Sequence, residues 1–123
     1  MVGGSESATR VPLCNLNSGS RVTVHSWGEG VVTTTNDHPL LWGENNCNVY
    51  YDDFNGTSSA SAIVAGAAAS LQGVAVANLG DRLDPLTLRQ LLVATGTPQA
   101  AGPNGELIGP QPDLAAAIEE MLP

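Results

Sequence analysis

The sequence predicts a single α/β domain, and three observations support this fold class. Short runs rich in β-branched residues, at residues 21–25 and 30–35, predict strands. Residues 57–73 are apolar at almost every position, which predicts a helix buried inside a core. Two later segments carry helix-start signals and predict amphipathic helices. A chain of 123 residues is long enough for one core of this kind.

The N-terminal part of the chain holds the predicted strands. Residues 2–3 are expected to end a first strand. Residues 21–25 alternate between polar and apolar side chains, and residues 30–35 are β-branched, so we expect two short strands joined by a turn at residues 27–30. Residues 35–54 are predicted to form a long polar loop that leads into the first helix.

Three helices are predicted in the remainder. The first covers residues 57–73. The second has Asp84 as its N-cap and Pro85 at its first position, and it is expected to stop before Gly96. The third covers residues 112–123, in which apolar side chains recur at spacings of three and four. The expected layers are short strands, a buried central helix and two C-terminal amphipathic helices.

The charge of the chain limits its partners. Twelve acidic residues against four arginines give a net charge of -8. Such a surface repels phosphate backbones and anionic lipids, so neither nucleic acid nor a membrane surface is an expected partner. The longest apolar stretch, residues 60–69, is shorter than the roughly 20 residues that span a bilayer. The N-terminus lacks the pattern of an export signal, and no localisation is assigned.

A cluster of small hydroxyl side chains precedes the apolar helix. The first turn of a helix exposes unpaired N–H groups and a partial positive charge, which stabilise an oxyanion. A serine there, next to a small residue such as Gly56, is well placed to attack a carbonyl carbon. The alternative is purely structural, because serine and threonine are preferred N-caps and Thr57 or Ser58 could serve only to cap the helix.

The stretch GTSSASAIVAGAAASL, residues 56–71, resembles the serine motif of the subtilisin-like proteases, or subtilases. In that motif the nucleophile directly follows Gly-Thr. The resemblance therefore implies that Ser58 is the nucleophile and that its backbone N–H is an oxyanion donor. Gly56, Thr57 and Ser59 are the supporting residues that it implies. Two helix positions depart from the family pattern, with alanine where proline is usual and isoleucine where histidine is frequent.

Further segments extend the resemblance over nearly the whole chain. SGSRVTVHSWGEGVVTT is similar to the segment that precedes the serine in subtilases, in a variant with Trp-Gly in place of Pro-Gly. MVGGSES resembles a strand end before it, and LDPLTLRQLLVATGTPQ resembles the helix after the serine. Residues 1–123 are thus expected to form one partial domain, the C-terminal portion of a subtilase catalytic domain, with the N-terminal part of the sheet missing.

The resemblance implies a serine endopeptidase that hydrolyses peptide bonds of a polypeptide substrate. Subtilases order their triad Asp, His, Ser, and the Asp and His motifs are not found in this sequence. An upstream segment of the parent protease is therefore the expected partner that supplies them. The chain alone is expected to be nearly inactive, because an unassisted serine hydroxyl stays protonated. The alternative is a noncatalytic interaction or vestigial domain with the same fold.

Two other catalytic arrangements are disfavoured. A triad inside this chain would need His25 or His38 with Asp37, Asp52 or Asp53, but these histidines are in unconstrained positions. An α/β-hydrolase esterase would need a histidine after the serine, and none follows Ser58.

Other candidate sites receive structural interpretations. Cys14 and Cys47 fit no zinc spacing, and one disulfide between them is left open. No cofactor or metal is assigned; calcium is bound by some subtilases, but the loop oxygens here are read as solvated ones: Asn45, Asn46, Asn48, Asp52 and Asp53. Asn55 begins a glycosylation sequence, yet a glycan there would block the serine turn. Trp27 and Trp42 are expected to be packing residues.

Overall fold

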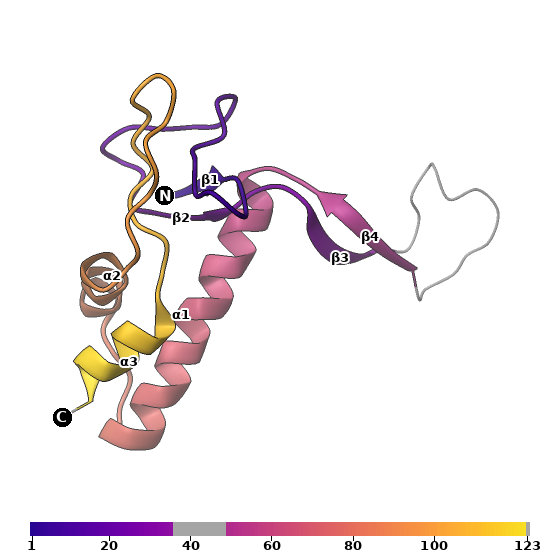
Figure 1. Cartoon of the computed structure of the whole chain (residues 1–123). Coiled ribbons are helices and arrows are strands. Elements are labelled where there is room, and N and C mark those ends of the chain that lie inside the picture. The colour runs from indigo at the N-terminus through magenta and orange to yellow at the C-terminus, as the bar shows by residue number, and fades with distance from the viewer. Residues whose placement is uncertain (36–48, 123) are drawn as a thin grey trace.

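The computed structural model describes residues 1–35 and 49–122, and Figure 1 shows their arrangement. In chain order the described elements are β1 (Val2–Ser5), β2 (Val24–Trp27), β3 (Val31–Thr35), β4 (Val49–Phe54), α1 (Thr57–Leu79), α2 (Pro85–Ala94) and α3 (Leu114–Met121). β1 and β2 lie across the start of α1, a β3–β4 ribbon extends to one side, and α2 and α3 lie on the other side of α1. The predicted α/β class is confirmed.

The described strands form two separate two-stranded sheets. β1 and β2 are parallel, with Val2 opposite Val24, whereas β3 and β4 are antiparallel. The two strands predicted near residues 21–25 and 30–35 are thus present as β2 and β3, but they belong to different sheets. The Gly28 N–H donates to the Ser5 carbonyl at 2.9 Å, so the chain after β2 continues along β1 instead of folding back on itself.

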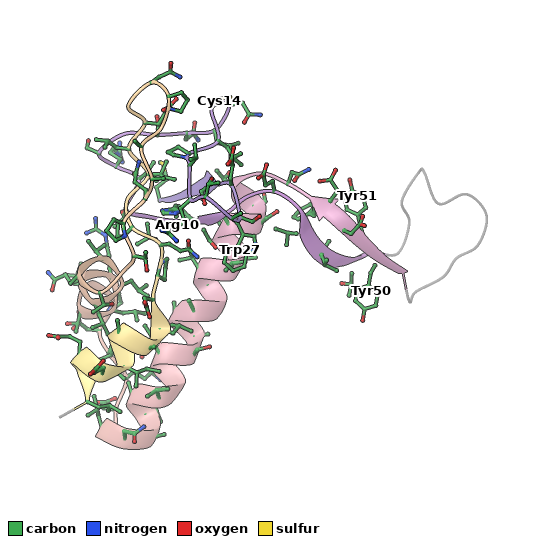
Figure 2. All side chains as sticks on the ribbon, in the orientation of Figure 1. Arg10, Cys14, Trp27, Tyr50 and Tyr51 are labelled. Carbon is green, nitrogen blue, oxygen red and sulfur yellow. The ribbon has the colours of Figure 1, made fainter. Side chains whose placement is uncertain are left out.

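The segment predicted as a loop ends in a strand. β4 occupies residues 49–54, so the loop prediction is wrong there, while residues 36–48 lie outside the described part of the chain. Pairing with β3 satisfies the backbone of β4, and a ribbon exposed on its faces tolerates polar side chains. Figure 2 shows Tyr50 and Tyr51 on opposite sides of the ribbon, and Tyr50 is 69% exposed.

The first helix is longer than predicted. α1 passes through Gly73 and ends at Gly80, which takes the left-handed conformation with φ of 81° and donates to the Val76 carbonyl. One glycine inside a helix costs only about 1 kcal/mol relative to alanine, and the flanking residues outweigh it. The positive φ at Gly80 is what stops the helix, as in other C-caps formed by glycine.

The two C-terminal helices begin where the sequence predicts. The Asp84 carboxylate accepts hydrogen bonds from the amides of Leu86 and Thr87, and Pro85 occupies the first position of α2. The Asp113 carboxylate accepts a hydrogen bond from the Ala116 amide at the start of α3. These side chains satisfy amides that have no partner inside the helix, so local sequence sets both starts.

The buried core joins one face of α1 to β2, α2 and α3. It contains the side chains of Val24, Val64, Leu71, Leu92 and Ala117. The expectation that α1 is enclosed is wrong for this chain, because only five of its 23 residues are buried. Two short strands and two short helices are too few to cover every face of such a helix.

By length and composition alone, α1 is long and apolar enough to cross a membrane. The prediction that no apolar stretch is long enough to span a bilayer is therefore wrong. The apolar character continues past residue 69 because the interrupting residues are few and uncharged. The absence of a membrane partner stays a prediction.

Candidate active site

Adjacent serines at the start of α1 have opposite environments. Ser58, the second residue of the helix, is exposed, whereas Ser59 is 2% exposed. The Ser59 hydroxyl donates to the Phe54 carbonyl at 3.3 Å, which ties the helix to the end of β4. Ser58 is therefore the one of the two whose hydroxyl an incoming molecule can reach, and Ser59 supports the turn.

No side chain caps the N-terminus of α1. The N-cap is Gly56, with φ of 96° and ψ of 179°, and the helix has no side-chain cap hydrogen bond. The alternative in which Thr57 or Ser58 serves as the N-cap is therefore wrong, since both already lie within the helix. The first-turn amides have no acceptor inside the helix, so this terminus keeps its donors and its partial positive charge for another group.

Three backbone segments hold the serine turn in place. The Gly56 N–H donates to the Gly28 carbonyl at 2.7 Å, and the Gly28 N–H donates to the Ser5 carbonyl at 2.9 Å. The positive φ of Gly56 is a conformation that glycine adopts without strain. These bonds connect β1, the end of β2 and the start of α1, so the position of Ser58 depends on residues far apart in the sequence.

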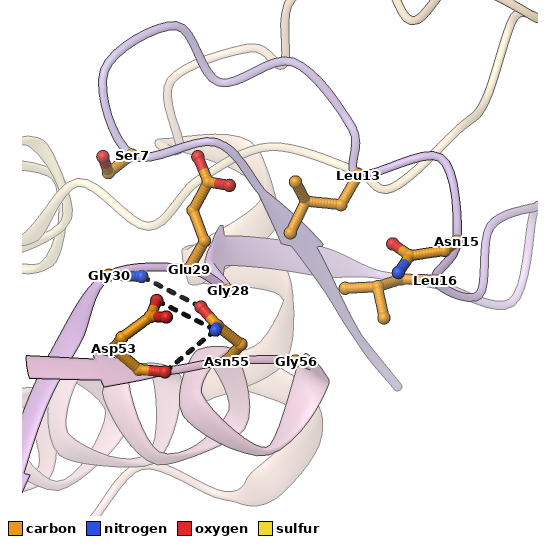
Figure 3. A pocket seen from close by; sticks show the side chains of 10 residues that line it. All are labelled: Ser7, Leu13, Asn15, Leu16, Gly28, Glu29, Gly30, Asp53, Asn55 and Gly56. Atoms are coloured by element: carbon orange, nitrogen blue, oxygen red, sulfur yellow. Dashed lines mark hydrogen bonds between the residues drawn. The ribbon is translucent and has the colours of Figure 1, made fainter. Parts of the chain in front are cut away.

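Asn55 fastens the residue before the turn. Its Nδ2 group donates to the Asp53 carbonyl at 2.8 Å and to an Asp53 carboxylate oxygen at 3.0 Å, while its Oδ1 accepts from the Gly30 N–H at 3.1 Å. Figure 3 shows these bonds. The Asn55 side-chain amide already makes hydrogen bonds within the protein. This is a second reason, besides its place beside the serine turn, to interpret Asn55 as a structural residue and not as a glycan acceptor.

A pocket of about 680 Å³ opens beside this turn (Figure 3). Carboxylates of Glu29 and Asp53 and the apolar side chains of Leu13 and Leu16 line it, together with Ser7, Asn15, Gly28, Gly30, Asn55 and Gly56. None of these residues carries a positive charge. An elongated ligand group in this pocket would contact apolar side chains and also two negatively charged carboxylates.

The predicted base candidates do not gather at Ser58. His25 is completely buried in β2 and its Nδ1 lies 2.7 Å from the Gly109 carbonyl oxygen. Asp52 and Asp53 are exposed on β4. His38 and Asp37 lie outside the described residues. Within residues 1–35 and 49–122, the side chains therefore bring no histidine to the serine.

The remaining predicted sites have mixed outcomes. Cys14 is a free, exposed thiol, and Cys47 lies outside the described residues, so a bridge between them stays a prediction. Where the structure describes the chain, no group of three or more potential metal-ligating side chains occurs. Trp27, the last residue of β2, is half-buried and lines a cavity together with Ile63 and Val64 of α1. Trp42 is not among the described residues.

Comparison with known proteins places this geometry in a family. The family model of the subtilases, peptidase family S8, matches residues 28–109, which is more than half of the chain. The chain belongs to the subtilase family. Subtilases are peptidases, so this chain has a serine protease fold, and the matched residues include the turn that carries Ser58. No curated protein matches it.

Among solved structures, the subtilase chain is similar to one described as the patellamide maturation protease PatA. The TM-score is 0.72 and the sequence identity 25%. The match covers 98% of this subtilase chain but only 42% of the PatA chain. The chain thus corresponds to less than half of that protease, and the resemblance to a partial subtilisin-like fold is confirmed.

Some residues of the site were not found from the sequence of this subtilase. The sequence places Gly28 and Glu29 only within a family-like segment, and it offers Asp53 only as a loop oxygen or as a disfavoured triad member. The signal in the sequence is the glycines of WGEG (residues 27–30) and FNG (residues 54–56), because glycine allows two backbones to approach each other closely. The sequence does not reveal that these two segments meet, because that contact forms only when β2 and β4 lead to the same place.

Proposed function

We propose that this chain is the serine-bearing part of a subtilisin-like endopeptidase, with Ser58 as its nucleophile. The observation that carries the proposal is the contrast at the start of α1, where Ser58 is exposed and Ser59 is buried and hydrogen-bonded. The absence of a side-chain cap on α1 supports it, since the first-turn donors remain available. Family membership makes peptide-bond hydrolysis the reaction to expect.

The chemistry follows from the position of the hydroxyl. Ser58 Oγ attacks the substrate carbonyl carbon while its proton passes to a histidine base. The resulting oxyanion accepts a hydrogen bond from the Ser58 N–H at the positive end of α1. The peptide nitrogen leaves with a proton, and water then hydrolyses the acyl-enzyme. Gly56 leaves room for the substrate backbone at this turn.

The base and its aspartate come, in this proposal, from an upstream segment of the parent protease. The exposed face of α1 supports such a partner, because it is made of small and apolar residues: Ala62, Ala65, Gly66, Ala69, Gly73, Val76 and Ala77. Small residues let another backbone approach a helix closely. Without that segment the hydroxyl has no base, and the chain alone is nearly inactive.

The pocket beside the turn suggests a substrate with a basic side chain. Glu29 and Asp53 lie next to Gly56 on the lining, and no described lining residue carries a compensating positive charge. Lysine or arginine of a polypeptide would place its apolar stem against Leu13 and Leu16 and its charge near the carboxylates. We therefore assign a polypeptide substrate with a preference for basic residues near the cleaved bond.

A fluorophosphonate probe, which reacts with activated serines, tests the proposal. The chain is labelled alone and after mixing with a separately purified N-terminal subtilase segment that contains the Asp and His motifs. We expect labelling in the mixture alone, with peptide mass mapping placing the adduct on Ser58. Ser58→Ala should abolish it, and the neighbouring Ser59→Ala should retain it.

The outcomes distinguish the two functions considered. Labelling that needs the added segment supports a protease completed by an upstream part. Binding of that segment without labelling, under conditions in which a complete subtilase is labelled, contradicts the assignment of Ser58 and favours the noncatalytic domain. Labelling that persists in Ser58→Ala would place the nucleophile elsewhere.

A further inference from the structure

His25 is an ionisable side chain that the proposed reaction does not use. It is 0% exposed, and its Nδ1 lies 2.7 Å from the Gly109 carbonyl oxygen, so Nδ1 carries the proton and donates. Its Nε2 is buried and has no hydrogen-bond partner among the described residues. Protonation would create a second N–H donor without an acceptor, which a buried site strongly disfavours.

The backbone around His25 joins β2 to residues 107–111. The His25 N–H donates to the Pro110 carbonyl at 3.0 Å, and the Gly19 N–H donates to the Leu107 carbonyl at 2.7 Å. With the imidazole bond to Gly109, three hydrogen bonds fasten this short segment to the region of β2. On its other side the segment bonds to residues 97–99: Thr97 and Gln111 exchange backbone hydrogen bonds at 2.8 and 2.7 Å, and the Ile108 N–H donates to the Gln99 Oε1 at 2.6 Å. The bonds to Gly19 and His25 are therefore what join the segment to the region of β2.

The packing of the segment leaves little free space. Ile108 is 2% exposed, and a methyl group added to Gly3 would lie 2.7 Å from its Cβ atom. Gly109 has φ of 75°, and a methyl group there would lie 2.2 Å from the Thr23 carbonyl oxygen. The segment is therefore closely packed against β1 and against the residue before β2.

The charges around His25 oppose its protonation. β1, α1 and residues 107–111 carry no ionisable side chain. Arg10 is a cation whose charge acts on His25, and Arg89 reaches Thr23, the residue before β2. The carboxylates next in sequence to β1 and to residues 107–111 are engaged elsewhere: Glu6 with the Thr9 hydroxyl, Glu106 with Asn104, and Asp113 at the α3 cap. Burial lowers the His25 pKa, the bond to Gly109 opposes this, and Arg10 lowers it further.

We propose that His25 is an acid-sensitive latch, which holds residues 107–111 against β2 when neutral and releases them when protonated. β2 leads directly to Gly28, whose carbonyl holds the Gly56 turn, so release acts close to Ser58. The latch stabilises the fold fully above the ordinary histidine pKa of 6.5. That contribution is lost as the pH falls below 6.5 toward the lower pKa of the folded state.

Amide hydrogen exchange of the full chain, followed by NMR, tests the latch. The informative amides are those of His25 and Gly19, since their acceptors are on the segment. After correction for intrinsic rates, we expect their protection to fall at least tenfold between pH 7.5 and pH 5, while α1 amides such as that of Leu71 keep theirs. His25→Asn retains a donor toward Gly109 but does not titrate, so its protection should not depend on pH.

His38→Asn is the matched control, because it removes the only other histidine. In that variant the His25 ring is the sole imidazole, and its titration midpoint should lie below 6.5 and coincide with the change in exchange of the two amides. A pH response that survives in His25→Asn overturns the latch. The latch is also overturned if all amides lose protection equally. It is likewise overturned if the His25 ring titrates at a different pH from the change in exchange of the two amides.

Discussion

Gly28 and Gly56 lie in direct backbone contact although they are far apart in the chain. The Gly56 N–H donates to the Gly28 carbonyl at 2.7 Å, and a methyl group on Gly28 would lie 3.1 Å from the Gly56 carbonyl oxygen. The end of β2 therefore seats the turn that presents Ser58. Position 28 requires glycine because of this close approach and not because of its backbone conformation, since its φ is not in the left-handed region.

Alanine at Gly28 should destabilise the fold. The added methyl group also meets the Gly4 backbone at 3.3 Å, so neither neighbour can yield easily. We expect Gly28→Ala to lower the free energy of unfolding by about 1–3 kcal/mol in urea denaturation. Gly66→Ala is the control, because nothing lies within 4 Å of its added methyl group and the helix should gain roughly 0.5–1 kcal/mol. Equal effects of the two substitutions would contradict the close contact.

The two serines should separate stability from chemistry. Ser59→Ala removes the hydrogen bond to Phe54 and should lower the free energy of unfolding by about 1 kcal/mol. Ser58→Ala changes an exposed side chain, so its effect on unfolding should stay within about 0.5 kcal/mol. Thermal and urea unfolding of both variants measure this. A larger loss for Ser58→Ala than for Ser59→Ala would contradict the environments described.

A charge on the exposed face of α1 should block assembly with the upstream segment. Ala69→Lys places an ammonium group on the face proposed to be covered, where its burial is unfavourable. We expect binding of the segment, followed by isothermal titration calorimetry, to weaken at least tenfold, with little change in the stability of the chain itself. Ala115→Lys on α3 is the matched control and should bind normally. Equal binding by both variants would argue that this face stays uncovered.

The carboxylates of the pocket should control the preference for basic substrates. Two exposed charge pairs each contribute about 0.2–1 kcal/mol, so replacing Glu29 and Asp53 by Gln and Asn should reduce the preference for arginine over norleucine about 2- to 30-fold in kcat/KM of the assembled enzyme. Asp52→Asn is the control, since Asp52 does not line the pocket. If the double variant stays active and keeps the same preference for arginine, the two carboxylates do not select the substrate. That outcome would not affect the role proposed for Ser58.

The stability of the start of α2 should decrease at acid pH. Hydrogen bonds from the Thr87 side chain and backbone lower the pKa of the Asp84 carboxyl below its usual 3.8. The ionised cap therefore stabilises α2 fully above pH 3.8, and this contribution is lost as the pH falls through the pKa of the folded state. Chemical shifts of the Leu86 and Thr87 amides should follow this loss. In Asp84→Asn, whose side chain still caps but does not titrate, they should show no such transition.

Features that depend on neighbours along the chain can be predicted from the residues alone. Asp84 with Pro85, and Asp113 before α3, set helix starts because their signals act within one turn. The serine motif likewise identifies the family and points to Ser58, because the motif lies within one continuous stretch of sequence.

How these parts meet depends on contacts that form only in the folded chain. It pairs β2 with β1, brings Gly28 to Gly56, and encloses His25 beneath residues 107–111. It also leaves most of α1 uncovered, although the composition of that helix predicts burial. Such features depend on which segments are present to pair and pack, and contacts between residues far apart in a chain leave no periodic pattern in its sequence.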